Sequence, residues 1–114
     1  MSEPRDDSVY LDHIRDSIDR VASYIGGVSE AEFLSTPLVQ DAVIRQIQII
    51  GEAASKLSRA FRSRSSAIPW NDIVGMRQKL VHDYLGVDLR AVWDTAVRDV
   101  PTLKAELEKL GQSE

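Results

Sequence analysis

Arg77, His82 and Tyr84 are the residues of this sequence whose types and spacing suit chemistry, and they lie within the stretch GMRQKLVHDYLG (75–86). The stretch is rich in helix formers, and apolar residues follow helical steps that pass through position 77. An arginine therefore occupies a position where the pattern predicts an apolar side chain. The imidazole of His82 titrates near neutral pH and fits acid–base catalysis, whereas the permanently charged, fork-shaped guanidinium of Arg77 fits a phosphate.

These three side chains do not form one cluster by helix geometry alone. On a helix turning about 100° per residue, Arg77 and Tyr84 fall within about 20° of each other, but His82 lies about 140° from Arg77 and roughly 7.5 Å along the axis. Either the long arginine reaches along the helix, or a symmetric dimer opposes two copies so that the groups line a shared groove. Each residue also has a structural alternative, as a snorkelling arginine, a helix-end histidine or a packing tyrosine.

Composition restricts the class of protein. The 114 residues include no cysteine, which excludes disulfides and thiolate sites, and the aspartates and the two histidines show no metal-ligand pattern, so we expect no metal and no cofactor. The longest apolar runs are only a few residues long, so we expect no membrane span. The acidic start MSEPRDDSVY does not resemble a secretory signal, and we therefore expect a cytoplasmic protein. The length predicts a single domain over 1–114.

Charge is unevenly distributed along this acidic chain. The net charge is −4, and residues 1–32 carry eight acidic and three basic residues. Residues 53–71 contain no acidic residue and four basic ones, which we call the basic strip: Lys56, Arg59, Arg62 and Arg64. The strip either holds a polyanion locally or is a solvated helix end whose cations complement the helix dipole.

Apolar stripes with helical spacing predict the elements that carry these residues. The first stripe covers 11–25 and is stopped by two glycines, and Ser29 with Glu32 makes a capping box for a short helix that Pro37 ends. The second stripe runs over 43–61, in a helix that begins near Pro37.

Two further helices complete the prediction. A third helix opens around PWND, with Asn71 or Asp72 as its cap, and runs to Tyr84. A fourth stripe covers 89–110 after Asp88 and contains Pro101, where we expect a kink or a break. No segment alternates with period two for long enough to predict a strand. The fold class is therefore all-α, an antiparallel bundle of four to five helices.

Gly51 and Glu52 stand in the middle of the second helix. Glycine there costs about 1 kcal/mol relative to alanine, so we expect another helix to approach closely, either within the bundle or in a second copy. Glu52 is either a solvated charge or the partner of a buried base.

The motif R-x4-H-x-Y formed by Arg77, His82 and Tyr84 resembles that of HEPN-domain proteins, specifically the HepT-like toxin family. The stretches IIGEAASKLS (49–58), IPWNDIVGMRQKLVHDY (68–84) and VDLRAVWDTAVRDVPTLKAEL (87–107) resemble that family in order and spacing, which covers most of the chain. The sequence departs from the family at position 78, where Gln78 replaces the usual asparagine or small polar residue but keeps the amide.

The resemblance implies a HEPN-like helical homodimer that acts as a metal-independent endoribonuclease toxin of a type VII-like toxin–antitoxin system. Arg77 and His82 would be catalytic, and RNA would be the substrate. Our own hypothesis adds that Gln78 and the basic strip (Lys56, Arg59, Arg62 and Arg64) guide the RNA backbone.

The resemblance also implies a partner, a cognate minimal nucleotidyltransferase antitoxin that adds AMP to Tyr84 and silences the toxin. A bulky anion there would compete for the site that an RNA phosphate uses. The alternative hypothesis is a non-catalytic helical module that only binds a nucleotidyltransferase. A generic nucleotide-binding bundle has least support, because no glycine-rich phosphate loop occurs.

Overall fold

The structure is a computed structural model that describes the backbone of residues 7–80 and 86–113 and the side chains of 7–76 and 86–110. The described residues are almost entirely helical and contain no strand, which confirms the predicted all-α class. In chain order the helices are α1 (Asp7–Ile25), α2 (Glu30–Leu34), α3 (Pro37–Ser55), α4 (Arg59–Arg64), α5 (Trp70–Leu80), α6 (Leu89–Asp94), the π-helical segment η1 (Thr95–Asp99) and α7 (Val100–Ser113).

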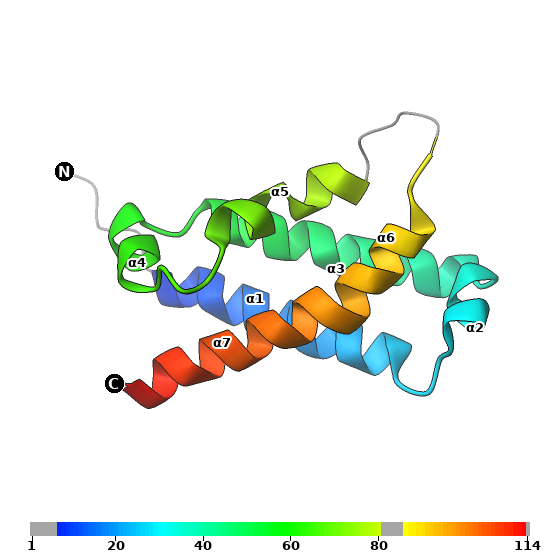
Figure 1. Cartoon of the computed structure of the whole chain (residues 1–114), viewed down its shortest axis with the longest axis horizontal. Coiled ribbons are helices and arrows are strands. Elements are labelled where there is room, and N and C mark those ends of the chain that lie inside the picture. Colours follow the sequence, from blue (N-terminus) through cyan, green and yellow to red (C-terminus); the bar gives the residue numbers. More distant parts are fainter. Residues whose placement is uncertain (1–6, 81–85, 114) are drawn as a thin grey trace.

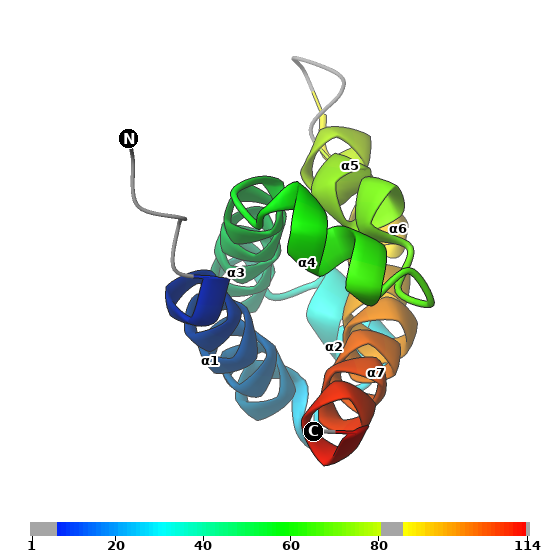
Figure 2. The ribbon, with the colours of Figure 1, turned by 90° about the vertical axis from the view of Figure 1, so that its left-hand side faces the viewer.

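The long helices run alternately in opposite directions, as in an antiparallel bundle (Figure 1). Helix α3 lies between α1 and α5, and α7 crosses α1 on the other side of the core (Figure 2). One hydrophobic core joins all of them, and its fully buried side chains include Ile14, Val21, Ile47, Ile50 and Leu107. None of the helices in the described ranges is long and apolar enough to span a membrane.

Helix α1 ends where the sequence predicts. Gly27 follows the last helical residues with φ of 77°, a left-handed conformation that glycine adopts without steric cost. At the other end of α1, the carboxylate of Asp7 accepts hydrogen bonds from the backbone N–H (2.8 Å) and the hydroxyl (2.7 Å) of Ser58. This contact joins the start of α1 to the start of α4, which is 51 residues later in the chain.

Helix α2 is too short to be stable alone and depends on its caps and on the core. The predicted capping box is confirmed, since Glu32 N–H donates to Ser29 Oγ and Ser29 N–H donates to Glu32 Oε1. Phe33 is fully buried against the ring of Trp93, with 5.3 Å between the ring centroids. The Gln40 side chain donates to the carbonyl of Phe33 at 2.9 Å. Helix α2 therefore ties α3 to α6.

The second apolar stripe was predicted as one helix but forms two. Helix α3 ends at Ser55, and α4 begins after Ser58, whose hydroxyl accepts from the N–H of Phe61 at 3.0 Å. The stripe continues across this break because Leu57 and Phe61 both remain buried in the core. Apolar spacing alone could not reveal the break, because the turn preserves the inward-facing positions.

Helix α5 begins at Trp70, which makes Pro69 its N-cap, so the predicted caps Asn71 and Asp72 are wrong by two and three positions. The carbonyl of Pro69 accepts the first helical hydrogen bond, from the N–H of Ile73 at 3.1 Å. The indole N–H of Trp70 donates to the buried hydroxyl of Ser65 at 2.9 Å, which fixes the helix start against α4. The described part of α5 ends at Leu80, and the predicted extension to Tyr84 lies outside the described residues.

Of the kink or break predicted at Pro101, the break does not occur. Asp88 caps the start of α6, and the helical backbone then continues through η1 into α7. In η1 the backbone hydrogen bonds span five residues instead of the four of an α-helix. For example, Val100 N–H donates to Thr95 O. The wider turn accommodates Pro101, which lacks an N–H and would clash with the preceding turn of a regular α-helix.

Candidate functional site

Of the R-x4-H-x-Y motif, only Arg77 falls within the described part of α5. The backbone of Arg77 and Gln78 belongs to the last turns of this helix, but their side chains are outside the described set. His82 and Tyr84 lie outside the described residues altogether. How these four side chains lie relative to one another therefore remains a prediction.

Both flanks of the segment 81–85 are held by the fold. On one flank, Ile73 and Met76 of α5 are buried in the core, and α5 packs on α3. On the other flank, Asp88 accepts a hydrogen bond from Ala91 N–H at 3.1 Å and so fixes the start of α6. The motif is thus attached to a rigid helix on one side and to a capped helix start on the other, as a positioned site requires.

The middle of α3 is buried at the positions that suggested close packing, namely Gly51, Ala53 and Ala54. Close approach of another helix at Gly51, within the bundle or from a second copy, stays a prediction. Glu52 is exposed, and its Oε2 lies 3.7 Å from Nζ of Lys56 one turn later. This contact supports the interpretation of Glu52 as a surface charge.

The four cations of the basic strip have different surroundings. Arg62 donates from Nη2 to the carbonyl of Ala54 at 3.0 Å, and its Nε is buried with no hydrogen-bond partner among the described residues. Its guanidinium thus satisfies a carbonyl at the end of α3. Arg64 lies over the ring of Phe61, 5.6 Å from the centroid, as a cation–π pair. Lys56 contacts Glu52. Arg59 is exposed.

Two of these arginines line a groove of about 480 Å³, which we call the basic groove. Arg59 and Arg62 from α4 face the first residues of α5 across it, and Figure 2 shows these two elements together at one end of the molecule. The N-terminus of α5 adds partial positive charge, while Asp72 adds an opposing negative one. The remaining polar lining consists of Ser63, Ser66 and Asn71.

Sequence reasoning found the arginines of this groove but missed its other half. Its lining residues all fall within 59–72, so the groove is local in the sequence, but helical spacing did not indicate that the serines and the first turn of α5 share a surface with the arginines. On α5 the groove is lined by Trp70, Asn71 and Asp72. Trp70 precedes Arg77 by seven residues, or roughly 10 Å of helix. Within the described parts of the chain, no group of three or more histidine or acidic side chains is placed to hold a metal ion.

The fold and the motif place the chain among the all-α, HEPN-type helical proteins. The sequence model of the ribonuclease HepT-like family matches residues 14–110. The chain belongs to this ribonuclease family, and the match includes all three motif positions.

Curated relatives agree with this assignment. A candidate RNase of Caldanaerobacter subterraneus subsp. tengcongensis is 36% identical over 105 residues, covering 92% of this chain and 94% of the relative. A candidate ribonuclease HepT of Thermococcus cleftensis is 39% identical over 89% of this chain and 92% of its own length. A Methanocaldococcus jannaschii protein named as a gamma-glutamylcyclotransferase and candidate RNase is 41% identical, and the match spans 93% of this chain but 48% of that protein. No solved structure matches the chain.

Proposed function

We propose that this protein is a metal-independent endoribonuclease toxin of a type VII-like toxin–antitoxin system, with Arg77 and His82 as catalytic residues. The observation that carries the proposal is the family match over residues 14–110, which spans the motif. We further propose that residues 1–114 act as one domain, and that a cytoplasmic homodimer forms the RNA cleft at its interface.

The chemistry follows from the residue types. His82, as the general base, removes the proton from a ribose 2′-hydroxyl, and the 2′-oxygen attacks the adjacent phosphorus. Arg77 donates to the phosphate oxygens, where charge accumulates in the transition state. The bond from phosphorus to the 5′-oxygen breaks, and that oxygen takes up a proton. The products are a 2′,3′-cyclic phosphate and a 5′-hydroxyl end.

The decisive experiment is to incubate the purified chain with RNA in the presence of EDTA and to characterise the new ends. Internal cuts with 2′,3′-cyclic phosphate ends are the expected result. Intact RNA together with a stable nucleotidyltransferase complex would instead favour the non-catalytic interaction module. Cleavage that requires an added divalent metal would contradict metal independence.

RNA guidance is proposed for Gln78 and for the basic strip of Lys56, Arg59, Arg62 and Arg64, of which Arg59 and Arg62 line the basic groove. The double variant K56Q/R59Q should weaken RNA binding and flatten its salt dependence, because each lost phosphate contact lowers the log–log slope by ~0.7. Fluorescence anisotropy with labelled RNA over a salt series measures both effects. Arg62 is left intact because its guanidinium also bonds to Ala54 O.

A matched control separates guidance from overall charge. Arg15 is exposed on the acidic helix α1 and does not line the basic groove. R15Q therefore removes one positive charge outside the groove and should leave the slope of log affinity against log salt unchanged. An unaltered slope in K56Q/R59Q would remove the basic strip from the RNA site.

Tyr84 is proposed as the acceptor of AMP from a cognate minimal nucleotidyltransferase. Coexpression of the two proteins should add AMP-sized mass to the peptide containing Tyr84, and the modified chain should lose RNA cleavage because the new phosphate competes with that of RNA. Mass spectrometry of the intact chain and of its peptides checks this prediction. Tyr84→Phe should abolish the addition, whereas Tyr10→Phe and Tyr24→Phe should not. AMP on another tyrosine would contradict the assignment.

A further inference from the structure

A second groove, of about 260 Å³, lies between α5 and the η1–α7 segment. Its floor is apolar and is built from Ile73, Met76 and Leu103, each at most 6% exposed. Its rim carries three carboxylates, which come from α5, η1 and α7: Asp72, Asp99 and Glu106. We call this the acidic groove.

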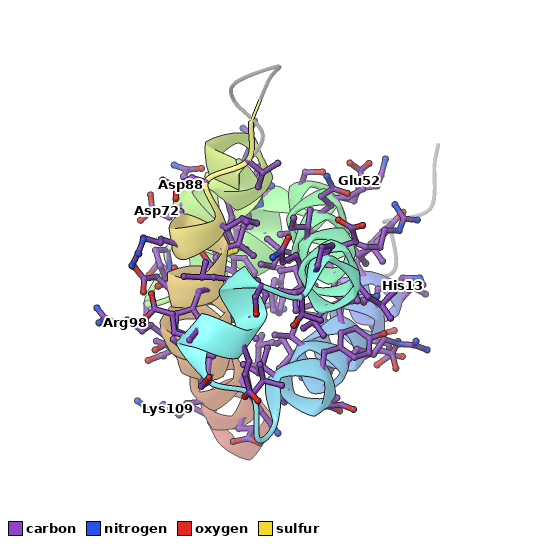
Figure 3. The ribbon with its side chains drawn as sticks, turned by 90° about the vertical axis from the view of Figure 1, so that its right-hand side faces the viewer. His13, Glu52, Asp72, Asp88, Arg98 and Lys109 are labelled. Atoms are coloured by element: carbon purple, nitrogen blue, oxygen red, sulfur yellow. The ribbon has the colours of Figure 1, made fainter. Side chains whose placement is uncertain are left out.

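The rim carboxylates differ in their pairing with the protein's own cations. Neither Asp72 nor Asp99 has an ion-pair or hydrogen-bond partner through its side chain among the described residues. Glu106 contacts the exposed Lys109, with 3.6 Å between Nζ and Oε2. Arg98 is exposed beside Asp99 in sequence, and Figure 3 shows Asp72 and Arg98 projecting on the same side of the molecule, opposite Glu52 and His13.

We propose that the acidic groove binds an arginine or lysine side chain presented by a partner protein. Its volume is below the usual range for small-molecule pockets, roughly 300–1,000 Å³, and suits one long side chain. Such a side chain places its aliphatic stem on apolar surface and its charged head among acceptors. In the acidic groove, the apolar floor suits the aliphatic stem and the carboxylate rim suits the charged head.

Charge also decides which kind of partner fits. RNA phosphates are repelled by three carboxylates, whereas a cationic side chain is attracted to them. The basic groove shares Ile68, Pro69 and Asp72 with the acidic groove, so two surfaces of opposite sign meet at the start of α5. A protein partner can therefore occupy one surface while a polyanion occupies the other.

A ligand in the acidic groove would contact α5, the helix that carries Arg77. Ile73 and Met76 of the floor belong to the helix that carries Arg77, and Met76 immediately precedes it. A ligand that packs on this floor therefore touches the helix that holds the motif. The docking proposal does not rest on ribonuclease activity, and its test requires no RNA.

Methionine methyl NMR gives a direct test, because the chain has just two methionines, and Met76 lines the groove. The probe is a capped pentapeptide, Ala-Leu-Arg-Leu-Ala, titrated into the ¹³C-methyl-Met protein. The Met76 signal should shift saturably in the millimolar range expected for a single side-chain contact, while the Met1 signal stays fixed. The peptide with citrulline in place of arginine has the same shape without the charge and should bind roughly tenfold more weakly.

Variants and dilution complete the test. D72N/D99N should weaken binding of the arginine peptide to the level of the citrulline peptide. D94N, which alters an exposed carboxylate on α6, should leave that binding unchanged. The absence of a saturable Met76 shift, or equal shifts with both peptides, would overturn the proposal. A Met76 signal that moves on dilution of the protein alone would assign the groove to a second copy of the chain and would also overturn it.

Discussion

His82→Ala should reduce the rate of RNA cleavage about a hundredfold or more, because a positioned general base contributes roughly 10²–10⁴ to the rate. Arg77→Ala should cause a comparable loss, since removal of a donor to the developing charge typically costs about 10²–10³. Arg77→Lys should recover only part of the activity, because lysine keeps the charge but loses the two-pronged geometry. The measurement is the initial rate of cleavage by the purified protein with EDTA present.

The chain offers matched controls for these variants. His13 is exposed on α1 and is the other histidine, so His13→Ala should retain full activity, as should Arg15→Ala. Each variant should keep its helical circular dichroism and its urea midpoint. If Arg77→Ala and His82→Ala both unfold, the two residues have structural roles; if both stay folded and active, they are not catalytic.

Phe33→Ala should destabilise the protein by about 3–5 kcal/mol, the usual cost of deleting a buried aromatic side chain. Phe33 is 0% exposed, and its ring lies against Trp93 at 5.3 Å between centroids. Helix α2 has five residues and cannot persist without this anchor, so the variant should also loosen the contact of α2 with α6. The loss is a large share of the roughly 5–15 kcal/mol that typically stabilises a domain.

Urea unfolding followed by circular dichroism gives the free energy of unfolding for this comparison. Leu38 is the second residue of α3 and is 79% exposed, so Leu38→Ala should change the free energy of unfolding by less than about 0.5 kcal/mol. A cost below about 1 kcal/mol for Phe33→Ala would contradict the role of α2 as a clamp between α3 and α6.

Much of the fold could be predicted from the sequence because local signals and the core pattern agree. The glycines after Ile25, the Ser29–Glu32 capping box and the Asp88 cap each satisfy backbone groups near them, so they act independently of the rest of the chain. The stripe residues are buried as predicted, for example Ile14 and Ile47. Sequence also supplied the motif of Arg77, His82 and Tyr84 and the family to which it belongs.

The errors arose where one apolar pattern fits two backbones. The stripe over 43–61 is compatible with one helix or two, and the tertiary contacts of Ser58 with Asp7 accompany the break between α3 and α4. Pro101 is compatible with a break or with a widened turn, and packing of Val100 and Leu103 in the core keeps the helix continuous through η1. In each case burial elsewhere in the chain outweighs the local preference.

The sequence by itself determined the helical class, the helix ends that carry their own caps, and the family motif for which we propose ribonuclease chemistry. Only the tertiary structure decided which charges share a surface. It separated Arg64 and Lys56 from the basic groove, and it brought the carboxylates of Asp72 and Asp99 together over one apolar floor. The physical reason is that caps and stripes depend on neighbours within a few residues, whereas a groove depends on how distant helices pack.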